Sequence, residues 1–134
     1  MTNKKYKLGL DLHGVSDKIP EFFSLISKLM VDAGHEVVII TGKMKKHGAE
    51  EEAKSLGLYY TNFYSIVDYN LEKGVKPEFD KNGHPWISEE IWNKTKAEIC
   101  KKEKIDLHID DSECYGKHFE TPYALVSICL NKST

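Results

Sequence analysis

The sequence predicts an α/β protein with a doubly wound, Rossmann-like parallel sheet of about five strands. Short apolar runs alternate along the chain with segments in which apolar residues recur every three or four positions. A continuous run such as Val37 to Ile40, closed by Thr41 and Gly42, is typical of a parallel strand covered on both faces. Because 134 residues bury only one core, we expect a single domain over residues 1–134.

The predicted elements follow one another without an internal repeat or linker. Residues 6–12 form the first apolar run, and a helix is expected from Ser16, which with Asp17 can cap it, to Gly34. The face of this helix expected to be buried contains Ile19, Phe22, Phe23, Ile26, Leu29, Met30 and Ala33. The remaining elements are a strand at 37–40, a helix at 48–57, a strand at 59–67, a helix at 88–104 and strands at 106–110 and 123–130.

The middle of the chain is less regular. Between about residues 68 and 87 the segments EKG, KPEFDKNG and HPW supply repeated turn signals. They predict a loop or small hairpin, which would act as a flap near the site and not as another layer.

Composition and charge narrow the classes of function. A formal net charge of −2 argues against a protein whose main activity is coating nucleic acid. All 19 basic residues are lysine, so a phosphate contact must use lysine, backbone amides, hydroxyls or a metal ion. No apolar run is long enough to span a bilayer and no signal segment precedes the first strand, so we expect no membrane partner and a cytoplasmic location.

Cysteine and histidine give no sign of a zinc site. The three cysteines, Cys100, Cys114 and Cys129, are widely spaced and are expected to be reduced thiols. The spacing of His84, His108, Cys114 and His118 matches no compact zinc-ligand pattern. The basic cluster Lys43, Lys45, Lys46 and His47 follows the second strand, where a phosphate would approach, although a solvated loop is the commoner explanation.

Polar residues follow three of the predicted strands. Asp11 ends the first strand, Thr41 ends the second, and Asp110 and Asp111 end the fourth. In open α/β sheets, ligands bind beyond the carboxyl ends of the strands. Three carboxylates that converge there need a cation, and an all-oxygen ligand set favours Mg²⁺.

The segments DLHGV, VVIITG and HIDDS resemble the first, second and fourth motifs of the haloacid dehalogenase-like (HAD) phosphohydrolases, in the same order. The resemblance runs from Leu8 to about Leu130. It implies that Asp11 is the nucleophile that accepts the phosphoryl group and also binds Mg²⁺. It further implies that Asp110 ligates the metal directly, that Asp111 acts through water or orients the site, and that Thr41 binds a phosphoryl oxygen.

The family also uses a lysine between the nucleophile and the phosphoryl group. The helix before the fourth strand offers Lys94 and Lys96. With about 100° per residue, Lys96 shares a stripe with Trp92, Ile99 and Cys100, whereas Lys94 points nearly opposite. A lysine in an apolar stripe must direct its ammonium to a polar place, so Lys96 is the preferred candidate.

His13 is the main departure from the family pattern, because the phosphatases carry a second Asp two residues after the nucleophile. The backbone carbonyl of His13 could still bind Mg²⁺, and its imidazole could donate a proton to a leaving group. A structural, hydrogen-bonding histidine is an equal alternative. The substitution could also disable turnover, leaving a protein that binds a phosphorylated ligand or partner in a regulatory role.

The resemblance implies a HAD-like core with little or no cap, since the chain leaves little room for a cap domain. An open site admits bulky substrates such as a nucleotide or a polynucleotide end, or needs a partner or an oligomer to complete the pocket. We therefore expect a magnesium-dependent, nucleotidase-like phosphatase that hydrolyses a phosphomonoester through a phosphoaspartate. A signalling receiver domain fits less well, because its acidic pair would follow the first strand.

Overall fold

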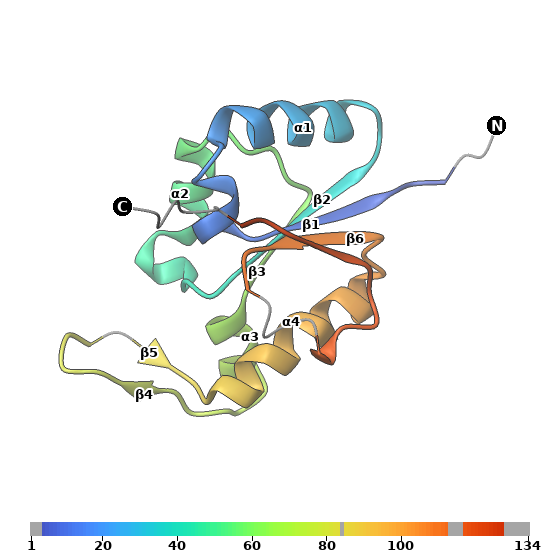
Figure 1. Cartoon of the computed structure of the whole chain (residues 1–134). Helices are drawn as coiled ribbons and strands as arrows, with labels where there is room; N and C mark the ends of the chain where they lie inside the picture. The colour runs from blue at the N-terminus through green and yellow to red at the C-terminus, as the bar shows by residue number, and fades with distance from the viewer. Residues whose placement is uncertain (1–3, 84, 113–116, 128–134) are drawn as a thin grey trace, which may run out of the picture.

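The computed structural model describes residues 4–83, 85–112 and 117–127 and contains a five-stranded parallel sheet (Figure 1). Its strands are β1 (Lys7–Leu10), β2 (Glu36–Thr41), β3 (Asn62–Ser65), β6 (Leu107–Asp110) and β7 (Tyr123–Leu125). Their order is β3-β2-β1-β6-β7, and every neighbouring pair is parallel. The predicted α/β class with a doubly wound parallel sheet is confirmed.

The order of the strands reverses at β1. The chain first builds outward through β2 and β3 and then returns to the other side of β1 with β6 and β7. Leu8 pairs with Val37 of β2 on one side and with Leu107 of β6 on the other. Ligands of open α/β sheets bind at such a reversal. The residues at the ends of β1 and β6, Asp11 and Asp110, lie there.

Helices cover both faces of the sheet (Figure 1). These are α1 (Pro20–Asp32) and α2 (Ala49–Ser55) on one face, and α3 (Ile66–Glu72) and α4 (Glu89–Glu103) on the other. In β2, Val37 and Ile39 belong to the core cluster that contains Phe23 of α1. Val38 and Ile40 belong to the cluster that contains Ile99 of α4. This alternation is the two-residue period of a strand with a core on each side.

The first helix buries a narrower face than the sequence predicted. Phe23 is buried, and Ile26 and Met30 are partly buried against the core. The predicted burial is wrong for Ile19, Phe22, Leu29 and Ala33, which are all exposed. A helix that lies on a sheet turns only one sector of its surface toward it, and the apolar positions of α1 extend beyond that sector.

The start of α1 also differs from the prediction. Helix α1 begins at Pro20, and its preceding residue makes no side-chain capping bond. Ser16 lies in a helical turn, Leu12–Ser16, where its hydroxyl donates a hydrogen bond to the carbonyl of Asp11 (2.8 Å). Ser16 therefore closes the turn after β1 and does not cap α1.

Helix α3 occupies residues that the sequence analysis assigned to a strand and a loop, so that assignment is wrong. Strand β3 ends at Ser65, whose hydroxyl accepts a hydrogen bond from the backbone N–H of Asp68 (3.2 Å). This bond caps the helix. The aromatic and β-branched residues around Ser65 favour a strand by composition, but the capping contact is local and begins a helix.

The rest of the irregular segment contains β4 (Glu78–Phe79) and β5 (Pro85–Trp86), which pair antiparallel just before α4. A second short helical turn, Lys45–His47, follows β2. Strand β7 ends at Leu125, and residues 128–130 of the predicted last strand lie outside the described residues, as do His84, Cys114 and Cys129. In the described part of the chain, no helix combines the length and the apolar character needed to cross a membrane.

A buried polar contact joins α3 to α4 and yields a stability prediction. The Asn70 amide donates to the hydroxyl of Thr95 (3.0 Å), which donates to the carbonyl of Ile91 (2.6 Å). Replacing Thr95 by valine keeps the shape but leaves one Asn70 N–H without this acceptor, so Thr95→Val should destabilise the fold by about 1–3 kcal/mol. Urea unfolding measures this loss. A change below about 0.5 kcal/mol, the usual effect of surface substitutions, would show that the contact contributes nothing.

Candidate active site

The carboxyl ends of β1 and β6 bring together the three acidic residues that the sequence singled out. Asp11 follows β1, and its backbone N–H donates to the carbonyl of Ile109 in β6 (3.2 Å). Asp110 ends β6, and Asp111 comes next. One carboxylate oxygen from each of Asp11, Asp110 and Asp111 lies within 4.8 Å of the others. Three negative charges therefore meet at the reversal of the sheet.

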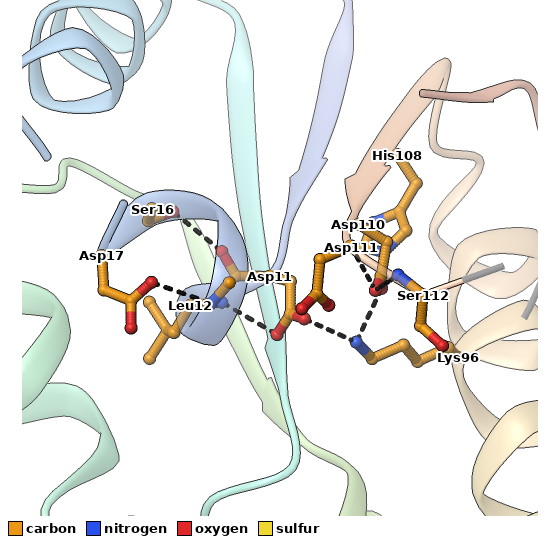
Figure 2. A network of polar contacts seen from close by, with 10 residues as sticks. Asp11, Leu12, Ser16, Asp17, Lys96, His108, Asp110, Asp111 and Ser112 are labelled. Atoms are coloured by element: carbon orange, nitrogen blue, oxygen red, sulfur yellow. Dashed lines mark hydrogen bonds and ion pairs between the residues drawn. The ribbon is translucent and has the colours of Figure 1, made fainter. Parts of the chain in front are cut away.

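Lys96 of α4 lies among these carboxylates (Figure 2). Its Nζ is 2.7 Å from Oδ2 of Asp110 and 3.2 Å from Oδ2 of Asp11, and the side chain is only 2% exposed. Lys94 instead pairs with Glu90 on the exposed side of the same helix (2.9 Å). Of the two lysines that the sequence offered, Lys96 is the one that reaches the acidic residues.

Asp110 is fully buried and accepts hydrogen bonds at both carboxylate oxygens. Oδ1 accepts from the backbone N–H groups of Asp111 (2.8 Å) and Ser112 (3.2 Å). Oδ2 accepts from Lys96 (2.7 Å) and lies 2.9 Å from Nε2 of His108. Burial alone would raise the pKa of Asp110, but the contacts with His108 and Lys96 outweigh it and hold this pKa below its usual value. Asp110 is thus an ionised, firmly fixed carboxylate.

His108 is a site residue that the sequence analysis missed. It is fully buried, and burial lowers its pKa, so the neutral imidazole donates Nε2–H to Asp110. The available signal was the two-residue spacing of His108 and Asp110, because residues two apart on a strand lie on the same face. The sequence prediction treated His108 only as a candidate zinc ligand, so its contact with Asp110 was not expected.

Keeping Asp11 ionised costs more free energy than keeping Asp110 ionised. Burial raises the pKa of Asp11, the ammonium of Lys96 opposes the rise, and the charge of Asp110 adds to it. Its Oδ1 accepts a hydrogen bond from the backbone N–H of Leu12 (2.9 Å), which fixes the orientation of the carboxylate. The pKa of Asp111 is also raised, by partial burial and then by the charge of Asp110.

The turn after β1 requires glycine at position 14. Gly14 has φ of +82°, a conformation that other residues rarely adopt. A Cβ at this position would also overlap the carboxylate of Asp111. The two segments that follow β1 and β6 therefore approach each other closely because residue 14 has no side chain.

Among the described residues, no hydrogen bond joins the Thr41 hydroxyl to the acidic residues. Thr41 lies at the end of β2 and is fully buried, and its hydroxyl has no hydrogen-bond partner among the residues that the structure describes. The residues that follow it, Gly42 and Lys43, line the cavity in front of Asp11, whereas Thr41 does not.

His13 is held by a residue that the sequence analysis did not select. Nε2 of His13 lies 2.9 and 3.1 Å from the two carboxylate oxygens of Glu52 in α2. Glu52 also accepts a hydrogen bond from Nζ of Lys43 (3.2 Å). Partial burial raises the pKa of Glu52, but the bonds with His13 and Lys43 outweigh it and lower this pKa. Glu52 stands in a run of three glutamates, and their spacing gave no means of choosing among them.

A cavity of about 810 Å³ opens in front of these residues. Asp11, His13, Lys96 and Asp111 form one part of its lining. The rest comes from the segment after β2, the β4–β5 hairpin and α4, with Gly42, Lys43, Met44, His47, Asn82, Gly83, Pro85 and Trp92. A Cβ on Gly42 would overlap the ring of Trp92, so the indole packs directly on the backbone there. The cavity combines a charged region with apolar walls.

The residues present fit a divalent cation such as Mg²⁺. The donors are all oxygen, and three carboxylates against one ammonium leave two negative charges. Asp11 and Asp111 line the cavity, whereas Asp110 does not, and both of its oxygens already accept hydrogen bonds. The side chains of Asp11 and Asp111 are thus the more accessible ligands.

No family model matches the sequence, and no curated protein is significantly similar to it. Among solved structures, a glycosyltransferase from Rickettsia africae ESF-5 aligns with 90% of this chain at 14% identity and a TM-score of 0.49, but the chain covers only 29% of that protein. A universal stress protein in complex with cAMP aligns at 12% identity and a TM-score of 0.44, over 91% of this chain and 96% of the other. Both likenesses are too remote to bear on the function of this chain.

The buried charge of Asp11 predicts a gain in stability when it is removed. A raised pKa means that the folded state binds the proton more tightly than the unfolded chain, so this group stabilises the fold below its ordinary pKa of 3.8 and loses that effect as the pH rises through about 6. Asp11→Asn should therefore stabilise the metal-free protein at pH 7 by about 1–3 kcal/mol.

Urea unfolding in chelator from pH 4 to pH 7 measures this difference. The Asn variant should show a flatter pH profile than the wild type over this range. Glu72→Gln, an exposed carboxylate at the end of α3, is the matched control and should keep the wild-type profile. An Asp11→Asn variant less stable than wild type at pH 7 would contradict the inference that the buried charge of Asp11 destabilises the folded protein.

Proposed function

We propose that this chain is a magnesium-dependent phosphatase of the HAD-like type, which hydrolyses a phosphomonoester through a phosphoaspartate on Asp11. The observation that carries the proposal is the buried ammonium of Lys96, within 3.2 Å of Asp11 where both side chains line the cavity. A phosphoryl group that approaches Asp11 brings negative charge to a carboxylate. Lys96, whose side chain is almost fully buried, offsets that charge.

The arrangement supports a two-step reaction. An oxygen of Asp11 attacks phosphorus, the bond from phosphorus to the leaving oxygen breaks, and that oxygen takes a proton from His13. Water then attacks the phosphorus of the phosphoaspartate and gives a proton to His13, the bond between phosphorus and the Asp11 oxygen breaks, and inorganic phosphate leaves with Asp11 and His13 both restored. The bond from the backbone N–H of Leu12 keeps the Asp11 carboxylate oriented throughout.

The residues that would hold Mg²⁺ are Asp11 and Asp111, with the backbone carbonyl of His13. A bound Mg²⁺ supplies charge neutralisation for the phosphoryl oxygens. Asp110 would join this set only by giving up one of its hydrogen bonds, so in this proposal its first role is to hold Lys96. We assign Thr41 no direct role in this proposal, because it is not among the residues that line the cavity.

The size of the cavity supports a leaving group larger than a simple alcohol. A volume of about 810 Å³ exceeds the space that one phosphate fills, and Met44, Pro85 and Trp92 offer apolar walls beyond the charged region. A phosphorylated small molecule, a nucleotide or a polynucleotide end would fit these dimensions. Lys43 and His47, which also line the cavity, would favour a substrate with further negative charge.

The first test is phosphate release from an aryl phosphate and a panel of nucleotides, with Mg²⁺ or with chelator. Wild type should release phosphate only with Mg²⁺, and Asp11→Asn should lose about a thousandfold or more of the rate, because no covalent intermediate can form. Lys94→Met, which removes the exposed lysine of α4, should retain full activity. Equal rates for wild type and Asp11→Asn would refute the mechanism.

The contact between Glu52 and His13 predicts a dependence on the leaving group. An alkyl phosphate needs a proton on its leaving oxygen, whereas an aryl phosphate has a good leaving group without one. Glu52→Gln should therefore reduce kcat for an alkyl phosphate about tenfold or more, while kcat for an aryl phosphate changes little. His13→Ala should give the same pattern. Equal losses on both substrates would assign Glu52 a merely structural role.

The histidine at position 13 also supports a second candidate, a protein that binds a phosphorylated ligand without turnover. His13 has an exposed side chain whose Nε2 is held by the carboxylate of Glu52 in α2. Phosphate release that is absent in wild type but gained in His13→Asp would favour this candidate. Calorimetric binding of a phosphorylated ligand to the inactive wild type would then measure its affinity.

A further inference from the structure

Trp92 forms an aromatic wall of the active-site cavity and has no part in the proposed reaction. It lies in the first turn of α4, where its backbone N–H donates to the carbonyl of Ser88 (2.9 Å), and it lines the cavity. Lys96 comes four residues later, so the two side chains leave the same face of the helix. At 1.5 Å per residue, the two positions are about 6 Å apart along the helix axis. The indole therefore lies one helical turn from the residue whose ammonium faces Asp11.

The indole ring of Trp92 is held in place from two sides. A Cβ on Gly42 would lie 2.3 Å from two atoms of its six-membered ring, so the edge of the ring packs directly on the backbone after β2. The side chain is partly buried and packs against the core cluster that contains Val38 and Ile99. A ring fixed in this way is a prepared stacking surface, because a ligand that packs on it immobilises little that was free before.

The cavity combines two chemistries at a fixed separation. Asp11 and Lys96 belong to its charged part, whereas Met44, Pro85 and Trp92 are apolar. Its volume of about 810 Å³ lies within the range of about 300–1,000 Å³ that is usual for pockets of small organic ligands. A ligand that fills both parts carries a phosphoryl group and a flat ring with a spacer between them. In an aryl phosphate the ring is bonded to the phosphate oxygen itself, so the spacer is missing.

We propose that the substrate of this site is a free nucleoside 5′-monophosphate, whose base stacks on the indole of Trp92 while its phosphate lies at Asp11 and Lys96. The sugar supplies the spacer, and it carries the base and the 5′ carbon on the same side, as α4 carries Trp92 and Lys96 on one face. Bases stack on aromatic side chains because each has a flat π surface. A chain of net charge −2 offers a long polyanion little electrostatic gain, which favours a free nucleotide over a polynucleotide end. This assignment rests on the proposed function, which places the phosphate at Asp11.

Steady-state kinetics with two kinds of substrate test the role of Trp92. Ribose 5-phosphate shares the sugar and the phosphate of a nucleoside 5′-monophosphate and lacks the base. Wild type should prefer the best of the four common nucleotides in kcat/KM, and Trp92→Leu should reduce this preference about tenfold or more, mainly through KM. A merely structural role of Trp92 would lower kcat/KM for both substrates alike, and that result overturns the assignment.

Trp86 provides the matched control for this experiment. It lies in β5, is 47% exposed and is not among the residues that line the cavity. Trp86→Leu should therefore keep the wild-type preference for the nucleotide. A wild type that hydrolyses ribose 5-phosphate as efficiently as every nucleotide overturns the substrate class but leaves the phosphatase in place.

A fluorescence titration distinguishes failure of this assignment from failure of the phosphatase. The chain has two tryptophans, so the double variant Asp11→Asn, Trp86→Phe keeps only Trp92 and lacks the nucleophile. With Mg²⁺, at least one of the four nucleoside 5′-monophosphates should quench its fluorescence, whereas ribose 5-phosphate should not. The double variant Asp11→Asn, Trp92→Phe keeps only Trp86 and should show no quenching.

Each outcome of the titration decides one of the two proposals. Quenching by a nucleotide, in a protein whose wild type releases no phosphate, supports nucleotide binding and refutes the phosphatase. No quenching by any of the four nucleotides overturns the assignment of Trp92, even where the wild type is an active phosphatase. Equal quenching by phenyl phosphate, or tighter binding of a 5′-phosphorylated oligonucleotide, overturns the assignment of a free nucleotide.

Discussion

The ion pairs of Lys96 connect the helix layer to the end of the sheet. A buried ammonium must be matched by negative charge, and Asp11 and Asp110 supply it from two different strands. The same contacts fix α4 over the junction of β1 and β6, and Asp110 in turn anchors His108 and two backbone N–H groups. A charge that is costly to bury thus holds in place the residues that would perform the chemistry.

The site divides into a rigid part and a variable part. Asp11, Asp110 and Lys96 stand on strand ends and a long helix, where buried hydrogen bonds and ion pairs leave each side chain little freedom. The outer wall comes from the turn after β2 and from the β4–β5 hairpin, whose strands have two residues each. Under the proposed function, such an arrangement would let the outer wall vary with the substrate while Asp11 and Lys96 keep their geometry.

The parts of the fold that the sequence predicted well are those set by local patterns. The apolar run of β2 and the aspartates that directly follow β1 and β6 could be read from their order, and the helical phase of α4 distinguished Lys96 from Lys94. Glu52 could not be found in this way, because its contact with His13 joins two segments whose relative position depends on the whole fold. Helix α3 was not predicted because the capping bond of the Ser65 hydroxyl outweighs the strand preference of the neighbouring residues. The exposed residues of α1 were predicted to be buried because the spacing of apolar residues does not show how wide the buried face of a helix is.

The pairing of β1 with β6 has a consequence for the order in which the protein can mature during synthesis. The start of β1 is tied to the start of β6 by the bond from the backbone N–H of Lys7 to Asp106, 99 positions later in the chain. On the ribosome, β1 and β2 can pair early, but the other edge of β1 stays open until β6 emerges. Until then Asp11 lies beside an unpaired strand edge. Its counterion Lys96 and the neighbouring carboxylates are synthesised only when most of the chain has been made. A stalled or truncated chain would expose an aggregation-prone edge of β1 and would lack the acidic site. Chaperone binding would therefore protect the chain most between the synthesis of β2 and that of β6.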